Sequence, residues 1–236
     1  MRIVCIVHYN TQQLTAAAIR SLEKHTPGAY IFVFDNSDRT PFDPAGIDAD
    51  IEILDNTEGQ LIDFDRRLAC FPDKVPVANG YASAKHCMSV QWMFDHLDDE
   101  FLLMDSDVLV RRDISPLWDT RKAWVGHVHN HHSRFGNVDR VHPCLCFFNL
   151  PVLHANRVTY FNPDKMYALS NRRPDNAYDT GCWFYEDCRA KGLQGADIPD
   201  LERYILHLGH GSWKRNKMAS ASQWLDDNRE LWKIED

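Results

Sequence analysis

The sequence lacks three features that would place it in other protein classes. No apolar run approaches the roughly 18 residues that a helix needs to cross a bilayer, so no membrane span is expected. Its 26 Lys and Arg are outnumbered by 34 Asp and Glu, and the net charge of −8 argues against a nucleic-acid binder, which needs a basic surface. Its seven cysteines include no Cys-x-x-Cys pair, so they predict free thiols in a reducing compartment and no zinc knuckle.

The amino terminus runs from Met1 directly into the apolar segment Ile3 to Val7 and then into polar residues. That segment is too short for a secretory signal peptide. Together with the thiols, it predicts a soluble, cytoplasmic protein. A peripheral contact with the inner face of the cytoplasmic membrane is left open.

The first third of the chain alternates strand and helix patterns. A β-branched run over residues 2–8 predicts a buried strand, and a helix follows it from Asn10 and Thr11, which offer a cap. Apolar runs at Ile31 to Phe34 and Ile51 to Leu54 predict two further strands. Buried strands joined through helices pair in parallel, so we expect an α/β fold, with a Rossmann-like, mixed and mainly parallel sheet flanked by helices.

The rest of the chain gives less regular patterns. After mostly loop with one helical turn near residues 64–68, we expect a helix over 82–97, whose buried stripe includes Val90, Met93 and Phe94, and then a strand over 101–105. The second half predicts strands over 123–128 and 144–150 and helices over 181–191 and 220–232. We expect a single domain over residues 1–236, with a soft boundary after residue 110.

The most informative motif is Asp105-Ser106-Asp107, which directly follows the apolar run Phe101 to Met104. If that run is a strand, its side chains alternate, and the two carboxylates project to the same side at its carboxyl end. Carboxylate oxygens suit Mg²⁺ or Mn²⁺, which keep open positions for phosphate oxygens. The alternative is an ordinary turn, because Asp often hydrogen-bonds its own turn.

Context favours the metal interpretation. Ligands of an open parallel sheet bind outside the carboxyl ends of its strands. Asn10, Asp35 and Asp105 follow or end three of the expected strands. We therefore expect these polar side chains to meet at one rim of the sheet.

Four segments, taken in order, resemble the nucleotide-sugar glycosyltransferases of the A-type fold, particularly family 2. They are the first strand with His8-Tyr9-Asn10, the second strand with Asp35-Asn36-Ser37, Gly80 to His86, and Phe101 to Asp107. The resemblance implies a donor half over 1–110 and an acceptor half over 111–236, the latter with a carboxyl-terminal metal and diphosphate loop.

The resemblance also implies roles for the residues of the donor half. Asp35, Tyr9 and Asn10 would line the nucleoside pocket. Asp107 is the first candidate for the metal ligand, while Asp105 would bind the metal or contact the donor ribose or sugar. Lys85 and Ser106 complete the expected donor-binding set.

In such enzymes an acidic residue in the second half acts as general base on the acceptor hydroxyl. The resemblance implies Asp187 first, then Glu186, with Asp179 as a further candidate. The alternative is that adjacent acids on an amphipathic helix are simply solvated.

The segment from His207 to Lys214 is the other informative stretch. The resemblance implies that a late histidine returns to the metal, which favours His207 and then His210. Lys214 or Arg215 would bind the diphosphate, and Trp213 would stack on a sugar ring. The alternative is a glycine-rich turn with a stacked Trp.

The sequence also contains histidines to which the resemblance assigns no role, and it departs from the family pattern. His127, His129, His131 and His132 lack the carboxylate at helical spacing that hydrolytic zinc sites add, so we expect exposed loop histidines or a wall of the acceptor site. No Gln-x-x-Arg-Trp sequence of processive synthases occurs, which argues for one sugar per encounter. The resemblance favours inversion at the anomeric carbon.

The sequence thus predicts a metal-dependent glycosyltransferase that moves a sugar from a nucleoside diphosphate sugar to a hydroxyl of a glycan or glycolipid. One alternative is a non-catalytic nucleotide-sugar or carbohydrate-binding relative. A sugar nucleotidyltransferase is another, although the segment after the first strand has no Gly-rich phosphate loop. A zinc hydrolase built on the histidines is the remaining one.

Overall fold

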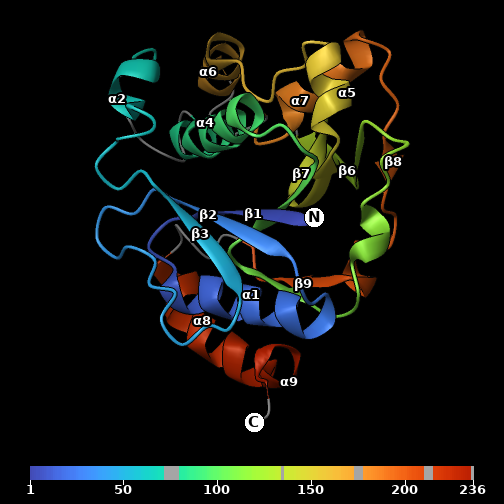
Figure 1. Cartoon of the computed structure of the whole chain (residues 1–236). Helices are drawn as coiled ribbons and strands as arrows, with labels where there is room; N and C mark the ends of the chain where they lie inside the picture. The colour runs from blue at the N-terminus through green and yellow to red at the C-terminus, as the bar shows by residue number, and fades with distance from the viewer. Residues whose placement is uncertain (72–79, 134–135, 173–177, 210–214, 235–236) are drawn as a thin grey trace. The chain divides into compact units, whose positions relative to one another are not determined.

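The computed structural model describes residues 1–71, 80–133, 136–172, 178–209 and 215–234. They form two compact units, each assembled from segments that are separated in sequence. The first unit contains Met1–Leu61, Phe101–Asp119 and Asp200–Asp236, and the second contains Ile62–Glu100 and Thr120–Pro199. The colours of Figure 1 show how blue, green and red segments combine in the first unit.

The first unit is built on four parallel strands in the order β3-β2-β1-β4. They are β1 (Ile3–His8), β2 (Tyr30–Asp35), β3 (Asp50–Asp55) and β4 (Phe101–Asp105). Every residue of β1 is buried, as expected for the central strand of a parallel sheet. The strand predictions for this half of the chain are confirmed.

Helix α1 (Gln12–His25) carries the apolar face that the spacing predicts, with Leu14, Ala17 and Leu22 almost fully buried. A short antiparallel ribbon of β5 (Val108–Val110) and β9 (Ile205–His207) belongs to the same unit. Helices α8 (Arg215–Asp227) and α9 (Arg229–Trp232) lie beside α1 in Figure 1.

The single helix expected over residues 220–232 is wrong, because the structure divides it. Helix α8 starts at Arg215 and ends at Asp227, and Asn228 separates it from α9. The Asn228 side-chain amide donates to the carbonyl of Trp224 at 2.8 Å and its backbone N–H to that of Leu225 at 3.3 Å. These bonds satisfy carbonyls that the interrupted helix leaves open.

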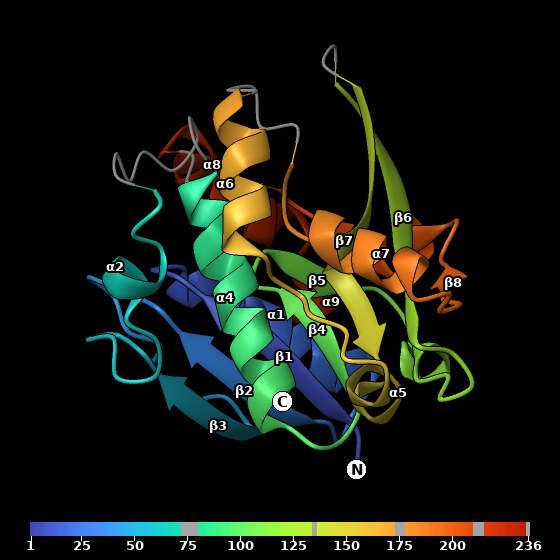
Figure 2. The ribbon, with the colours of Figure 1, turned by 90° about the horizontal axis from the view of Figure 1, so that it is seen from above.

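The second unit centres on a long antiparallel pair, β6 (Trp124–Ser133) and β7 (Gly136–Phe148), with β8 (Ala196–Asp197) parallel to β6. Helix α4 (Tyr81–His96) lies beside α6 (Pro163–Arg172), and α7 (Cys182–Ala190) lies along β7 (Figure 2). The second unit also contains two short helices, α2 (Phe64–Arg67) and α5 (Leu150–Ala155), among its described residues. The 3₁₀ turns η1 (Ser115–Leu117) and η2 (Leu201–Arg203) belong to the first unit.

An aromatic cluster forms the core of the second unit. Phe94 of α4 packs edge-to-face on Phe148 of β7 with ring centroids 5.0 Å apart. Phe184 of α7 stacks on Tyr160 at 5.5 Å, and all four rings are buried. Such pairs add to the large apolar area that each ring removes from water. The expected stripe of α4 is confirmed, because Val90, Met93 and Phe94 are all buried.

The fold class expected from the sequence is confirmed: parallel pairing predominates, one antiparallel hairpin makes the sheet mixed, and helices flank the strands. The second half differs from expectation in detail. Strand β7 begins eight residues before the predicted start at 144 (144 − 136), and α6 was not predicted. None of the helices in the described part of the chain is long and apolar enough to cross a bilayer.

Two glycines with left-handed backbones provide a test of the second unit. Gly181, at φ +79°, starts α7 so close to β7 that a Cβ atom would overlap the Val141 carbonyl oxygen, whereas Gly192, at φ +69°, faces open space. We expect Gly192→Ala to lower the free energy of unfolding by about 1–2 kcal/mol, the cost of a left-handed alanine. Gly181→Ala adds a backbone clash, so urea denaturation should show a larger loss. Equal losses would contradict this packing.

Candidate metal and nucleotide site

The polar strand ends of the first unit meet at one rim of its sheet. In the parallel register, His8 of β1 lies opposite Asp35 of β2, and Val7 lies opposite Asp105 of β4. Neighbouring strands are about 4.8 Å apart. Because β1 lies between the other two strands, the loop after β1 starts about 5 Å from the loops after β2 and β4, which are about 10 Å apart. All three loops start at the same rim, as the sequence predicts.

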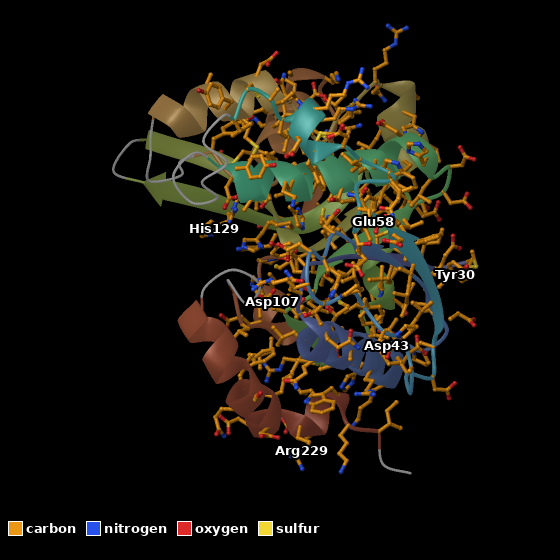
Figure 3. All side chains as sticks on the ribbon, turned by 90° about the vertical axis from the view of Figure 1, so that its left-hand side faces the viewer. Tyr30, Asp43, Glu58, Asp107, His129 and Arg229 are labelled. Atoms are coloured by element: carbon orange, nitrogen blue, oxygen red, sulfur yellow. The ribbon has the colours of Figure 1, made fainter. Side chains whose placement is uncertain are left out.

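Asp105, Asp107 and His207 form the candidate metal centre. One ligand atom from each side chain lies within 4.8 Å of the others. The His207 Nε2 atom is 3.2 Å from Asp107 Oδ1 and 3.9 Å from Asp105 Oδ2. All three side chains are largely shielded, with 19%, 10% and 25% exposed for Asp105, Asp107 and His207. Figure 3 marks Asp107 in this centre.

Strand pairing brings His207 to the two carboxylates. Val108 pairs with His207 in the β5–β9 ribbon, and the Leu208 N–H donates to the Asp107 carbonyl at 3.0 Å. Asp107 precedes Val108, so the ladder fixes the imidazole beside it across a separation of 100 residues (207 − 107).

The donor set fits a divalent cation. Two carboxylates match the oxygen preference of Mg²⁺ and Mn²⁺, and the imidazole nitrogen favours Mn²⁺, the transition-metal ion of the two. Three protein ligands leave positions for oxygen atoms of a substrate. The group can therefore hold one metal and a phosphate-bearing ligand together.

His8 is a fully buried link beneath the rim, which the sequence did not single out. Its Nε2 atom lies 3.3 Å from the Thr40 carbonyl, so Nε2 donates, and its Nδ1 accepts from the Thr15 hydroxyl at 2.7 Å. Burial lowers the His8 pKa, partly offset by the charge of Asp35 and the bond to Thr40. A neutral imidazole therefore ties the loop after β2 to helix α1.

The loops after β1 and β2 form a polar network around Asp38. The exposed Asp38 carboxylate accepts from Asn10 Nδ2 at 2.6 Å and from the Tyr9 hydroxyl at 3.1 Å. The bond from Asn10 is the largest cause of the lowered Asp38 pKa, with Tyr9 and Arg39 contributing against partial burial. Asn10 adopts a left-handed φ of 53°, and its Oδ1 accepts from the backbone of Arg39 and Thr40. The network joins Tyr9 and Asn10, which the sequence analysis named for the nucleoside pocket, to an acid that was not predicted.

Asp35 shapes this loop from beneath. It is 2% exposed, and its two oxygens accept from the backbone N–H groups of Ser37 at 2.8 Å and Phe42 at 2.7 Å. Its carboxylate thus fixes the backbone that presents Asp38. A direct contact of Asp35 with a nucleoside stays a prediction.

Ser106, between the two acids, connects the metal centre to the first loop. Its hydroxyl accepts from Thr11 Oγ1 at 3.3 Å, and Thr11 also approaches Thr15 and His8. Ser106 is 7% exposed. In this position it orients the turn between Asp105 and Asp107.

The candidate base Asp179 belongs to the second unit and lies in a buried network. Its carboxylate accepts from Ser83 at 2.6 Å, from Arg140 at 2.7 Å and from the Thr180 N–H at 2.7 Å. Burial alone raises the Asp179 pKa, but the Arg140 charge and these hydrogen bonds outweigh it and hold the pKa below its ordinary value. Arg140, a partner missed from the sequence, is only 8% exposed.

The other two base candidates lie on α7 of the same unit and also have partners. Glu186 pairs with Lys165, whose ammonium group lies 4.7 Å from the centroid of the Trp183 ring. Asp187 is buried and accepts from the Thr159 N–H at 2.9 Å and from Lys191 at 2.8 Å. These contacts connect α7 to α6 and to the segment before α6. A base role for any of the three acids stays a prediction.

Some of the remaining predicted residues lie in the second unit, and others lie outside the described part of the chain. Lys85 lies in α4 of the second unit, with its ammonium 4.8 Å from the centroid of the Phe64 ring. His127 lies in strand β6, within the strand predicted over 123–128, and His129 lies in the same strand, so a loop placement is wrong for His129. The two rings are 6.1 Å apart, and the His129 ring is 6.3 Å from that of His142 of β7. A role of these histidines as a wall of the acceptor site stays a prediction. His210, Trp213 and Lys214 lie outside the described residues, and so do the side chains of His131, His132 and Arg215.

The fold is that of the glycosyltransferase A-type proteins. The galactosyltransferase LgtC, in complex with donor and acceptor sugar analogs, superposes with a TM-score of 0.55 at 13% identity over 99% of this chain and 98% of that chain. An active-site mutant of LgtC gives 0.53 at 11% identity over the same shares. The glycosyltransferase GlyE of Streptococcus pneumoniae TIGR4 gives 0.49 at 14% identity over 96% of this chain and 51% of that chain.

Sequence comparisons find less. No family model matches the chain. No curated protein matches it either. The likeness to LgtC over the length of both chains therefore shows the fold, and the particular resemblance to family 2 stays a prediction.

The metal centre can be tested by titrating the protein with Mn²⁺ and measuring free Mn²⁺ by electron paramagnetic resonance. We expect Asp107→Asn and His207→Ala each to raise the dissociation constant by at least about tenfold, because each removes a direct ligand. The control Asp98→Asn removes an exposed carboxylate from the second unit and should leave the constant unchanged. Equal constants in all four proteins would exclude this centre.

The partly buried Asp179–Arg140 pair makes stability depend on pH. Because folding lowers the Asp179 pKa, the pair stabilises the fold above the unfolded pKa, and this stability is lost as pH falls from about 5 through the folded pKa. Asp179→Asn should cost about 3–5 kcal/mol at neutral pH by leaving Arg140 unpaired, and should flatten the acid limb of the stability curve.

Two variants control this measurement. Asp226→Asn breaks an exposed pair with Arg229 and should change the free energy of unfolding by less than about 1 kcal/mol. If Asp179→Asn does not fold, Ser83→Ala, which removes one hydrogen bond from Asp179, should give a smaller loss of the same kind. An unchanged acid limb in either Asp179 or Ser83 variant would contradict the assigned coupling.

Proposed function

We propose that this protein transfers a sugar from a nucleoside diphosphate sugar to a hydroxyl group of a glycan or glycolipid, with Mn²⁺ or Mg²⁺ as cofactor. The observation that carries the proposal is the Asp105–Asp107–His207 centre at the carboxyl rim of the parallel strands of a glycosyltransferase A-type fold. Ligands of open α/β sheets bind at this rim. LgtC, a galactosyltransferase of the same fold, is described with donor and acceptor sugar analogs.

Breaking the bond between the sugar and the diphosphate places negative charge on the leaving group. A bound divalent cation supplies electrostatic stabilisation of that charge. Asp107 and His207 hold the cation, and Asp105 either completes the ligand set or contacts the ribose or sugar of the donor. Ser106, tied to Thr11, keeps both acids in place.

The nucleoside is assigned to the loops after β1 and β2. Tyr9, Asn10 and Asp38 offer an aromatic ring, an amide and an ionised carboxylate on the same rim as the metal centre. An ionised carboxylate accepts hydrogen bonds from ribose hydroxyls, and the ring offers a face for the base. Asp35 and His8 hold these loops from below.

Acceptor activation is assigned to an acid of the second unit. Asp187, Glu186 and Asp179 stay the proposed bases in this order, and a carboxylate opposite the leaving group would give inversion. The anomeric configuration of the product, read by NMR, decides this part of the proposal: an inverted product supports it, and a retained configuration overturns it without affecting the donor site.

The donor site is tested with a panel of nucleoside diphosphate sugars, each with Mn²⁺ or with EDTA. We expect a Mn²⁺-dependent rise in melting temperature for one nucleotide class, since a ligand of the folded state stabilises it. With that donor, Asp107→Asn should lower the rate of nucleoside diphosphate release by about 100-fold or more, because it loses leaving-group stabilisation worth several kcal/mol.

Two comparisons make the result specific. Asp38→Asn should weaken nucleotide binding about tenfold while its affinity for Mn²⁺ stays that of the unchanged protein, since one charge-assisted contact is lost. Asp98→Asn should behave as the unchanged protein. A nucleotide-induced shift without turnover on any acceptor would support a non-catalytic binding relative, whereas turnover that survives Asp107→Asn would overturn the proposal.

A further inference from the structure

An arginine-lined pocket lies in the first unit, separate from the candidate metal centre. The pocket is open, has a volume of about 510 Å³, and is lined by Arg111, Arg112, Glu202 and Arg203. Among the described residues, three arginines and one acid thus line one space in a chain whose net charge is −8. None of these residues belongs to the proposed donor or metal site.

The pocket forms at one end of the β5–β9 ribbon. Val110 pairs with Ile205 as the last pair of that ladder, and the Arg111 N–H extends it by donating to the Tyr204 carbonyl at 2.8 Å. Residues 111–112 leave β5 at the same end at which η2 (Leu201–Arg203) leads into β9. Two segments almost a hundred residues apart therefore bring their arginines together.

The arginines are oriented mostly by groups that do not neutralise them. The Arg111 guanidinium donates to the backbone carbonyl of Glu202 at 2.9 Å, and the Arg112 guanidinium lies 6.0 Å from the centroid of the Tyr204 ring. Arg203 is 3.6 Å from the carboxylate of Asp200, an exposed pair of small energetic weight. Carbonyl and aromatic contacts hold a guanidinium while leaving its charge available to a ligand.

The ribbon separates the pocket from the metal centre. His207 pairs with Val108 at one end, next to Asp107, while the arginines follow Val110 at the other. Asp107 and Arg111 are four residues apart in sequence (111 − 107), which corresponds to about 13 Å along an extended strand. A donor diphosphate bound at Asp107 would not place its phosphates in the arginine pocket.

We propose that this pocket binds the phosphate group of a second ligand, as a phosphomonoester or phosphodiester that carries a small polar group. Arginine forks match phosphate oxygens with paired, charge-assisted hydrogen bonds. The volume of about 510 Å³ lies within the range of small-molecule sites, roughly 300–1,000 Å³, and so has room for more than a bare phosphate ion. A soluble phosphate ester and the headgroup of an anionic lipid share this chemistry.

The test uses two probes in metal-free buffer with EDTA, so that the metal centre does not contribute. Glycerol 3-phosphate is titrated by ³¹P NMR, and binding to vesicles of phosphatidylcholine, with or without phosphatidylglycerol, is measured by flotation. Arg112→Gln and Arg203→Gln should each weaken binding of the recognised probe by about fivefold or more, the effect of losing a charge-assisted contact.

Two further variants distinguish a loss of phosphate contacts from a loss of folding, because one should tighten binding and the other should leave it unchanged. Glu202→Gln removes the carboxylate found among the described lining residues and should tighten binding about threefold or more, because this carboxylate has the same charge sign as the phosphate. Arg229→Gln removes an exposed positive charge from α9 of the same unit and should leave binding unchanged.

The pattern of binding identifies the source of the phosphate. Binding of glycerol 3-phosphate in the absence of vesicles points to a soluble ester. Vesicle binding that requires phosphatidylglycerol points to a lipid headgroup. Either result, together with the stated effects of the variants, supports phosphate binding in this pocket. Binding of neither probe, or binding that is the same in Arg112→Gln, Arg203→Gln and Arg229→Gln, overturns it. The donor assays are independent of this result, because they depend on Asp107 and Mn²⁺.

Discussion

The candidate site depends on the short antiparallel ribbon of β5 and β9. Its ladder sets Val108 beside His207 and so brings an imidazole to two carboxylates that are far from it in sequence. Without this pairing, Asp105 and Asp107 are two acids at a turn. With it, the first unit presents a donor set for one divalent cation, and the opposite end of the same ladder gathers the arginines of the proposed phosphate pocket.

A second constraint acts beneath the nucleoside loops. His8 and Asp35 are neighbours in the parallel register, and both are buried. Both ring nitrogens of His8 and both carboxylate oxygens of Asp35 form hydrogen bonds to the loop or helix beside them. A buried polar group without partners costs free energy, so these bonds restrict the loops to conformations that keep them. The more exposed Asp38 and Tyr9 are held on this framework.

The sequence predicted the parallel half well for a physical reason. Strands buried on both faces appear as continuous apolar runs, and the polar residues after them must lie at one rim once the strands are parallel. Asp105 and Asp107 were predicted in this way, from their spacing after a strand, whereas His207 was predicted from the family resemblance; the structure brings the three side chains together. Asp38 lies in the acidic turn after β2 and was passed over because the family resemblance assigned the nucleoside contact to Asp35, the acid that ends the strand.

The second half was harder because its contacts are long-range. Arg140 and Asp179 form a partly buried pair, but nothing near either residue in sequence indicates the other. In β6 the only residues between His127 and His132 that are not histidines are Val128 and Asn130, so this part of the strand lacks the apolar run that predicts burial. Helix α8 was placed too late because its first turn holds charged and polar residues, and its end is set by the side chain of Asn228.

The three-segment composition of the first unit has a consequence for its synthesis. Residues 1–61 and 101–119 provide the parallel strands and the two acids, but β9, α8 and α9 come from residues after 200. Lys24 of α1 holds the last of these through the carbonyls of Glu230 and Lys233. A ribosome must therefore release the chain beyond Lys233 before this unit closes, and the second unit, Ile62–Glu100 and Thr120–Pro199, has the opportunity to fold first.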